Sequence, residues 1–129
     1  MKEIAGQAHV AAAWLFAVGV LLQGYLAGSA MGQLGGSGDF SAHIGVGYSL
    51  MGILALAVPI LALLGRLPRA QVGWSAVLLV LYVVQTSLPF ARADIPAIAA
   101  LHPVNAMLLL VLAVVLAVRG RRLMTANAA

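Results

Sequence analysis

Four long apolar segments, separated only by short connections, constrain the fold of this chain more than any other feature. They cover about residues 8–31, 40–64, 71–91 and 96–118. A helix of about 20 apolar residues crosses the hydrocarbon core of a bilayer. Charged residues make up 8% of the chain, whereas soluble proteins carry about 25%. The sequence therefore predicts an all-α membrane protein, in which residues 1–129 form a single domain, a bundle of four transmembrane helices.

The basic residues are distributed unevenly about these segments. All but Arg92 flank the expected spans on one side: Lys2, Arg66, Arg69, Arg119, Arg121 and Arg122. Basic residues mark the cytoplasmic side of membrane proteins, so both termini are expected to be cytoplasmic and to contact membrane lipid. No basic patch is interleaved with aromatic residues, and this argues against nucleic-acid binding.

The two halves of the chain resemble each other. The segment VGVLLQGYLAG in the first span resembles VLYVVQTSLPF in the third, so that Gln23 matches Gln85. Downstream, SAHIGVGYSLMGILALAV resembles AALHPVNAMLLLVLAV, so that His43 matches His102. The bundle is therefore expected to consist of two pseudo-repeated αα-hairpins related by an axis along the membrane normal.

His43 and His102 are the strongest candidates for a functional site. Each lies a few residues inside the second span of its hairpin, at the outer end. An ionisable residue in a span is costly and is a functional hypothesis by default. The two spans are expected to lie diagonally across the bundle, which leaves room for a haem with one imidazole on each side of the iron. The other nitrogen of each ring needs a partner, and a backbone carbonyl one turn earlier is expected. The chain has no cysteine, so thiolate ligation is excluded.

Five further residues are candidates for contacts with the haem: Gln23, Gly47, Gln85, Arg92 and Asn105. Gly47 would let the porphyrin edge approach the backbone, and Arg92 is the one basic residue on the outer side, near the propionates. Each of the five also has an alternative role that needs no ligand, namely helix packing, an interhelical hydrogen bond or a solvated charge. His9 has no matched partner and is expected to be an interfacial residue or a donor of a hydrogen bond between helices.

Several local features carry expectations of their own. Gly24 and Gly28 form a small-xxx-small pair that favours close approach of a helix or a flat ligand. Pro59 predicts a kink in the second span, and Asp94 is a plausible N-cap of the fourth. Pro103 leaves two choices, a kinked fourth helix or a helix that begins at this proline.

The four-helix unit, with a histidine near the outer start of its second and fourth helices, resembles one half of haem A synthase. The run His102–Asn105 also resembles a family of small uncharacterised bacterial membrane proteins with His-Pro-Val/Leu-Asn at the start of the fourth span. These resemblances imply a bis-histidine haem b site on His43 and His102 and a multi-pass protein of the bacterial cytoplasmic membrane. Haem A synthase has a carboxylate close before one ligand histidine and an arginine directly after it. Here Asp39 lies four residues before His43 and Ile44 follows it.

These expectations favour a b-type cytochrome that holds one haem b and transfers electrons to or from a quinone or a membrane redox partner. A single four-helix unit cannot hold both a donor and a substrate haem, so a haem-modifying enzyme is not expected. A second copy of the chain is a further candidate partner. Two alternatives remain, a cofactor-free accessory subunit of a larger membrane complex and a small transporter without an obvious coupling carboxylate.

Overall fold

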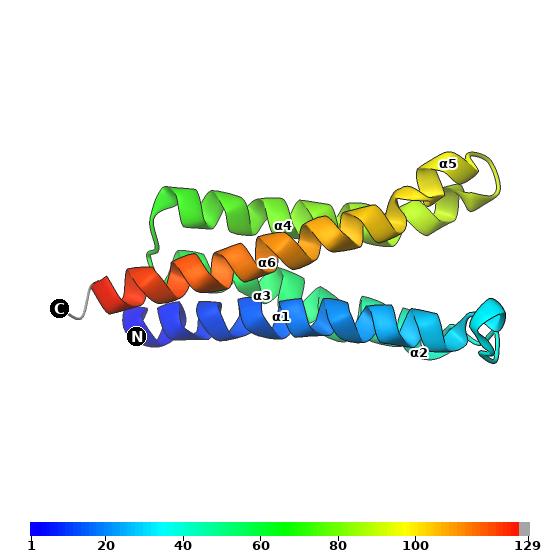
Figure 1. Ribbon diagram of the computed structural model, residues 1–129. Coiled ribbons are helices and arrows are strands. Elements are labelled where there is room, and N and C mark those ends of the chain that lie inside the picture. The colour runs from blue at the N-terminus through cyan, green and yellow to red at the C-terminus, as the bar shows by residue number, and fades with distance from the viewer. Residues whose placement is uncertain (127–129) are drawn as a thin grey trace.

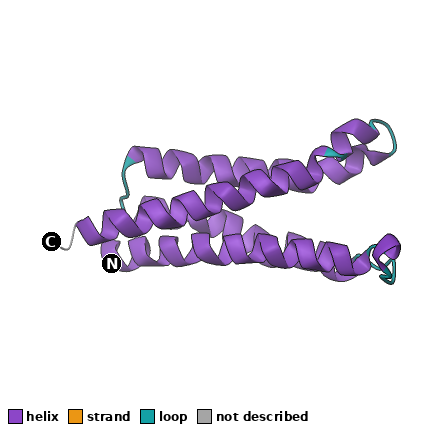
Figure 2. Ribbon diagram, in the orientation of Figure 1, coloured by secondary structure: helices purple, strands orange, loops and turns teal. Residues whose placement is uncertain are grey.

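The computed structural model describes residues 1–126 of the 129 and contains helices and no strand over that range (Figures 1 and 2). The elements are α1 (Lys2–Ala30), η1 (Gly32–Leu34), α2 (Ser41–Tyr48), α3 (Leu50–Leu64), α4 (Arg69–Ser87), η2 (Leu88–Arg92), α5 (Pro96–Ala99) and α6 (Leu101–Ala126). Within the described residues, four helical runs are long and apolar enough to cross a membrane: Lys2–Ala30, Ser41–Leu64, Arg69–Arg92 and Pro96–Ala126.

Two of these runs extend past the apolar segments that predicted them. Helix α1 begins at Lys2 rather than near residue 8, and α6 continues to Ala126 rather than ending near residue 118. Hydropathy marks only the part of a helix that suits hydrocarbon, whereas Lys and Arg favour helix in water as well. The polar flanks therefore continue the same helices.

The second run is interrupted at Ser49, between α2 and α3, and not at Pro59, where the sequence predicted a kink. Pro59 lies inside α3, which continues to Leu64. At Ser49 the hydroxyl donates a 2.6 Å hydrogen bond to the carbonyl of Gly45. Such back-bonding to the preceding turn competes with the backbone ladder and bends helices, which accounts for a break at this residue.

The fourth run begins before Pro103, and this settles the choice that the sequence left open. The short α5 starts at Pro96, and α6 starts at Leu101 after a break at Ala100. Pro103 lies in the first turn of α6, where a missing N–H is tolerated. Asp94 is not the N-cap as expected, because Ile95 occupies that position before Pro96.

The four runs form a closed ring of neighbours. Helix α1 packs on α3 and α6, and α4 packs on the same two helices. The second and fourth runs are therefore diagonal, as the short connections predicted. The start of α1, the end of α6 at Ala126 and the α3–α4 turn lie at one end of the bundle, here called the terminal end (Figure 1). The opposite end, with η1, η2 and α5, is called the loop end (Figure 1).

Burial is concentrated toward the terminal end. Phe16, Val58, Leu78 and Leu116 are fully buried there. In the loop-end half, residues 20–50 and 79–108, only Ala30, Leu88 and Asn105 are buried among the described residues. Figure 1 shows the α4–α6 pair diverging from α1 toward this end.

The surface near Gly24 and Gly28 is open. A Cβ atom added at either glycine would meet nothing within 4 Å. The expected close approach of a neighbouring helix at this pair is therefore wrong within the chain, because α1 and α6 have already separated at this level.

The loop before α2 is ordered by Asp39. Its carboxylate accepts a 2.8 Å hydrogen bond from the backbone N–H of Ser41, the first residue of α2. This bond stabilises the ionised form and holds the pKa of the fully exposed Asp39 carboxyl below its ordinary value. The carboxylate thus satisfies one N–H of the first turn.

Candidate functional site

The structure brings His43 and His102 together at the loop end. His43 projects from α2 and His102 from the first turn of α6, and both side chains are half-buried. Their ring centroids lie 6.2 Å apart with an interplanar angle of 69°. Phe40 packs edge-on against the outer side of this pair, 6.3 Å from the His43 ring centroid. The matched depth expected from the repeat is therefore observed.

The same contact orients both rings. Nδ1 of His43 donates to the backbone carbonyl of Gln23 at 3.1 Å, and Nδ1 of His102 donates to the carbonyl of Gln85 at 3.0 Å. A carbonyl partner was expected, but one turn earlier in the same helix, and that position is wrong. The carbonyls belong to the preceding helices, α1 and α4, so each hairpin fixes its own histidine. With the proton on Nδ1, the lone pair of each neutral ring lies on Nε2.

The two glutamine side chains behave differently. Nε2 of Gln23 donates to the backbone carbonyl of His43 at 3.0 Å, whereas Nε2 of Gln85 donates to Nε2 of His102 at 3.1 Å. The Asn105 amide donates to Oε1 of Gln85 at 2.8 Å and to the carbonyl of Leu81 at 2.9 Å. In the first hairpin Val46 stands three residues after its histidine, where the second has Asn105.

This difference leaves Gln23 incompletely paired. Its Oε1 is buried and has no hydrogen-bond partner among the described residues. A buried acceptor without a donor costs free energy, so the first half of the site retains a polar atom that an added group can use.

Gly47 and Arg92, two other predicted site residues, lie in different surroundings. A Cβ atom at Gly47 would be 2.6 Å from Nε2 of Gln23, so this glycine makes room for the glutamine that orients His43. Its carbonyl accepts a 2.9 Å hydrogen bond from the hydroxyl of Tyr82, a residue that the sequence argument did not include. Arg92 is exposed at the end of η2.

The site offers two imidazole nitrogens and no larger donor cluster. No group of three or more His, Cys, Asp or Glu side chains able to hold a metal ion occurs in residues 1–126. A cage built wholly from protein ligands is thus not formed by these residue types.

A second polar cluster lies at the terminal end around His9, which is fully buried. Of the two roles expected for this histidine, the structure confirms the hydrogen bond between helices. Nδ1 of His9 donates to the carbonyl of Val58 at 2.9 Å. Nε2 of His9 accepts a 3.0 Å hydrogen bond from Nε2 of Gln71. The partner Gln71 was missed because hydropathy gives no sign of which helices meet.

By its fold the protein is an apolar all-α bundle, in which each of two histidines bonds to the backbone carbonyl of a glutamine. Residues 23–92, more than half of the chain, match the sequence model of a family of unknown function, DUF6220. The chain belongs to this family. The matched region includes Gln23, His43 and Gln85 and ends before His102. No curated protein and no solved structure matches the chain.

Proposed function

We propose that this chain is a small b-type cytochrome of the bacterial cytoplasmic membrane, which binds one haem b through His43 and His102. The observation that carries the proposal is the repeated contact between each Nδ1 and a glutamine carbonyl, because it fixes Nε2 of both rings as the nitrogen with the lone pair. Hydrogen bonding of the second ring nitrogen is a regular feature of metal-ligating histidines.

The spacing of the rings supports the same ligand. Imidazole nitrogens lie about 2 Å from a bound transition metal. Two such bonds and the radii of two rings separate the centroids of opposed imidazoles by roughly 6 Å. The centroids of His43 and His102 are 6.2 Å apart, and they come from diagonal helices in the sparsely buried half of the bundle.

The remaining site residues take supporting roles under this proposal. The carbonyls of Gln23 and Gln85 hold the rings, and Asn105 holds the Gln85 amide. Arg92 supplies the one basic side chain of the loop end for propionates. A haem held by His43 and His102 would supply one-electron transfer, to or from a quinone or a partner subunit.

One contact favours the alternative of a cofactor-free accessory subunit. The Gln85 amide donates to Nε2 of His102, so the second histidine is already satisfied inside the protein. Ligation by His102 requires this amide to rotate away. In an accessory subunit the lone pair on Nε2 of His102 accepts from the Gln85 amide, whereas in a cytochrome it would bind the haem iron. This difference can be tested directly.

The test is the absorption spectrum of the full chain purified in detergent after expression with a haem precursor, together with a pyridine haemochrome assay. We expect one haem b per chain, with a Soret band and sharp α and β bands on reduction. His43→Ala and His102→Ala should each lose the six-coordinate spectrum. His9→Gln, which removes the third histidine, should retain it, and circular dichroism checks that every variant is folded.

Gln85→Leu sharpens the comparison. This change keeps the backbone carbonyl that orients His102 and removes the amide that competes for Nε2. Haem affinity should therefore be unchanged or higher than in the parent chain. A colourless parent chain, or an unaltered spectrum in both alanine variants, would contradict the proposal and favour the accessory subunit.

A further inference from the structure

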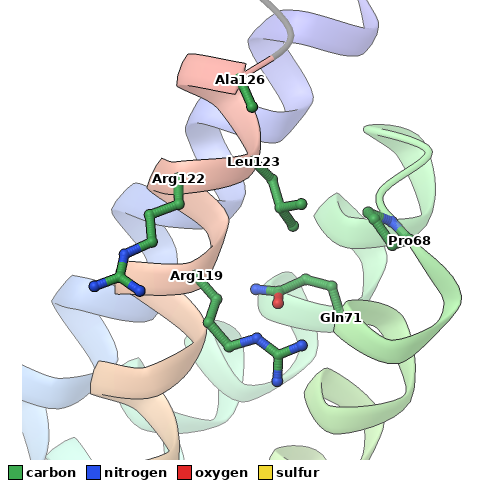
Figure 3. Close-up of a pocket in the computed structure, with 6 residues that line it drawn as sticks. All are labelled: Pro68, Gln71, Arg119, Arg122, Leu123 and Ala126. Atoms are coloured by element: carbon green, nitrogen blue, oxygen red, sulfur yellow. The ribbon is translucent and has the colours of Figure 1, made fainter.

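A polar groove lies between α4 and α6 at the terminal end, far from the paired histidines (Figure 3). Its lining residues are Pro68, Gln71, Arg119, Arg122, Leu123 and Ala126. Six of the seven basic residues of the chain flank the helices at this end, and Glu3 is the one acidic residue there. The local charge therefore favours an anionic ligand.

Gln71 supplies the second observation. Its side chain is 1% exposed and extends from α4 toward α6 in the wall of the groove (Figure 3). Nε2 donates to Nε2 of His9 at 3.0 Å and to the carbonyl of Leu116 at 2.8 Å. Both N–H groups of the amide are thus used, while Oε1 is buried with no partner among the described residues. The groove wall therefore presents an acceptor that lacks a donor.

The start of α4 adds to the attraction for anions. Its N-cap is Pro68, a lining residue of the groove, and no side chain caps the first turn. Free N–H groups and the helix dipole make such a terminus a site for phosphate. Arg119 extends into the groove from the facing helix, whereas the side chain of Arg122 points away from α4 (Figure 3).

An apolar groove continues from the polar one along α4 and α6. Arg119 lines both grooves, and the apolar groove is otherwise lined mainly by aliphatic and aromatic side chains that include Trp74, Val77, Leu108, Val111, Leu112 and Val115. An anionic head beside a long apolar channel is the pattern of a phospholipid.

We propose that the two grooves together bind one anionic phospholipid. Arg119 and the start of α4 hold its phosphodiester, and a headgroup hydroxyl donates to Oε1 of Gln71. An acyl chain lies in the apolar groove against Trp74. Phosphatidylglycerol, which carries both a phosphodiester and hydroxyl groups, has this chemistry. This inference is independent of haem binding.

The test uses the quenching of Trp74 by lipids with brominated acyl chains. The chain has two tryptophans, so Trp14→Phe in the full-length protein leaves Trp74 as the only tryptophan, whose fluorescence is excited selectively. The protein is reconstituted in phosphatidylcholine nanodiscs that contain a minor fraction of brominated phosphatidylglycerol or brominated phosphatidylcholine. We expect stronger quenching by the anionic lipid at equal mole fraction.

The control separates a site from diffuse surface attraction. Arg119→Gln and Arg121→Gln remove the same charge, but Arg121 does not line either groove. At about 0.5 M salt the Debye length is only about 4 Å, so diffuse attraction is screened. Under these conditions Arg119→Gln should lower the preference for the anionic lipid about fivefold. Arg121→Gln should retain the preference.

Three results would overturn the proposal. The first is equal quenching by both brominated lipids. The second is that Arg121→Gln and Arg119→Gln lower the preference for the anionic lipid equally. The third is displacement of the brominated phosphatidylglycerol by inorganic phosphate beyond the effect of chloride at the same ionic strength, which would assign the groove to free phosphate.

Discussion

At the scale of single residues, the paired histidines depend on side chains that carry no charge. Gln23 and Gln85 hold the rings through their backbone carbonyls, and Gly47 gives the Gln23 amide its space. The expected role of Gly47 was contact with a porphyrin edge. In the structure Gly47 lies against the side chain of Gln23. It therefore affects the site by leaving space for Gln23, whose backbone carbonyl orients His43.

Gly47→Ala tests this relation. The added Cβ would lie 2.6 Å from Nε2 of Gln23, so the amide must move and lose its bond to the His43 carbonyl. We expect a loss of about 1–2 kcal/mol in unfolding free energy, in the range of strong hydrogen bonds in membrane proteins. Thermal unfolding in detergent, followed by circular dichroism, measures the change.

Gly45→Ala is the matched control in the same helix. A Cβ at Gly45 meets nothing within 4 Å, and alanine favours helix over glycine by up to about 1 kcal/mol. This variant should be as stable as the parent chain or more so. Equal destabilisation by both changes would show that Gly47 does not act through Gln23.

At the scale of elements, helix ends and breaks follow hydrogen bonds that hydropathy does not encode. The second run breaks where Ser49 bonds back to Gly45, and Pro59 continues within α3. The α3–α4 turn shows the same dependence. Leu67 N–H donates to the carbonyl of Ala62 and Arg66 N–H to that of Leu63, each at 3.0 Å. This is the Schellman pattern that ends many helices.

Arg66 occupies the left-handed position of that turn with φ of 51°. Glycine adopts this conformation without the Cβ clash that costs other residues about 1–2 kcal/mol. Arg66→Gly should therefore raise the unfolding free energy by about 1 kcal/mol, after the greater freedom of the unfolded chain is subtracted. Urea or thermal unfolding in a mild detergent measures the gain.

Arg69→Gly is the control for the lost charge. It removes the same side chain from the first turn of α4, where the backbone is helical. Its stability should stay level or fall slightly, since glycine disfavours helix. If Arg66→Gly and Arg69→Gly lower the unfolding free energy equally, glycine does not stabilise the turn, and Arg66 is not strained at its positive φ.

At the scale of the whole molecule, the two ends of the bundle differ in packing. The terminal end holds the buried core and the His9–Gln71 cluster, and the loop end leaves its helices sparsely buried. Removal of a polar side chain should therefore lower the unfolding free energy more at the terminal end than at the loop end. Gln71 is 1% exposed, whereas Gln85 is half-buried.

Gln71→Leu and Gln85→Leu measure this difference. Loss of the Gln71 amide leaves Nε2 of His9 without a donor in the buried core and removes the side-chain donor of the Leu116 carbonyl, which should cost about 1–3 kcal/mol. Loss of the Gln85 amide should cost clearly less, because Asn105 retains its bond to Leu81. Unfolding free energies in one detergent give the comparison. Equal losses would contradict a core confined to the terminal end.

Part of the site could be predicted from sequence because it rests on repeated residue types. The matched positions of His43 and His102 in two similar hairpins predicted that the rings meet, and the structure places them together. The choice of Gln23 and Gln85 as neighbours also followed from matched polar positions, whereas Asn105 was chosen as an uncharged polar residue close to His102. The contact of Tyr82 with Gly47 could not be predicted, because a single tyrosine in an apolar span belongs to no repeat or motif.

The sequence by itself determined four long apolar helices, the clustering of positive charge at one end and the pairing of two hairpins. Length and hydropathy suffice for these features, because they are properties of each segment alone. Only the tertiary structure decided that His9 is buried, that Gln71 meets it, and that the loop end stays open. Helices that are apolar on every side give no sign of the face that packs, so the contacts between them depend on the assembled bundle.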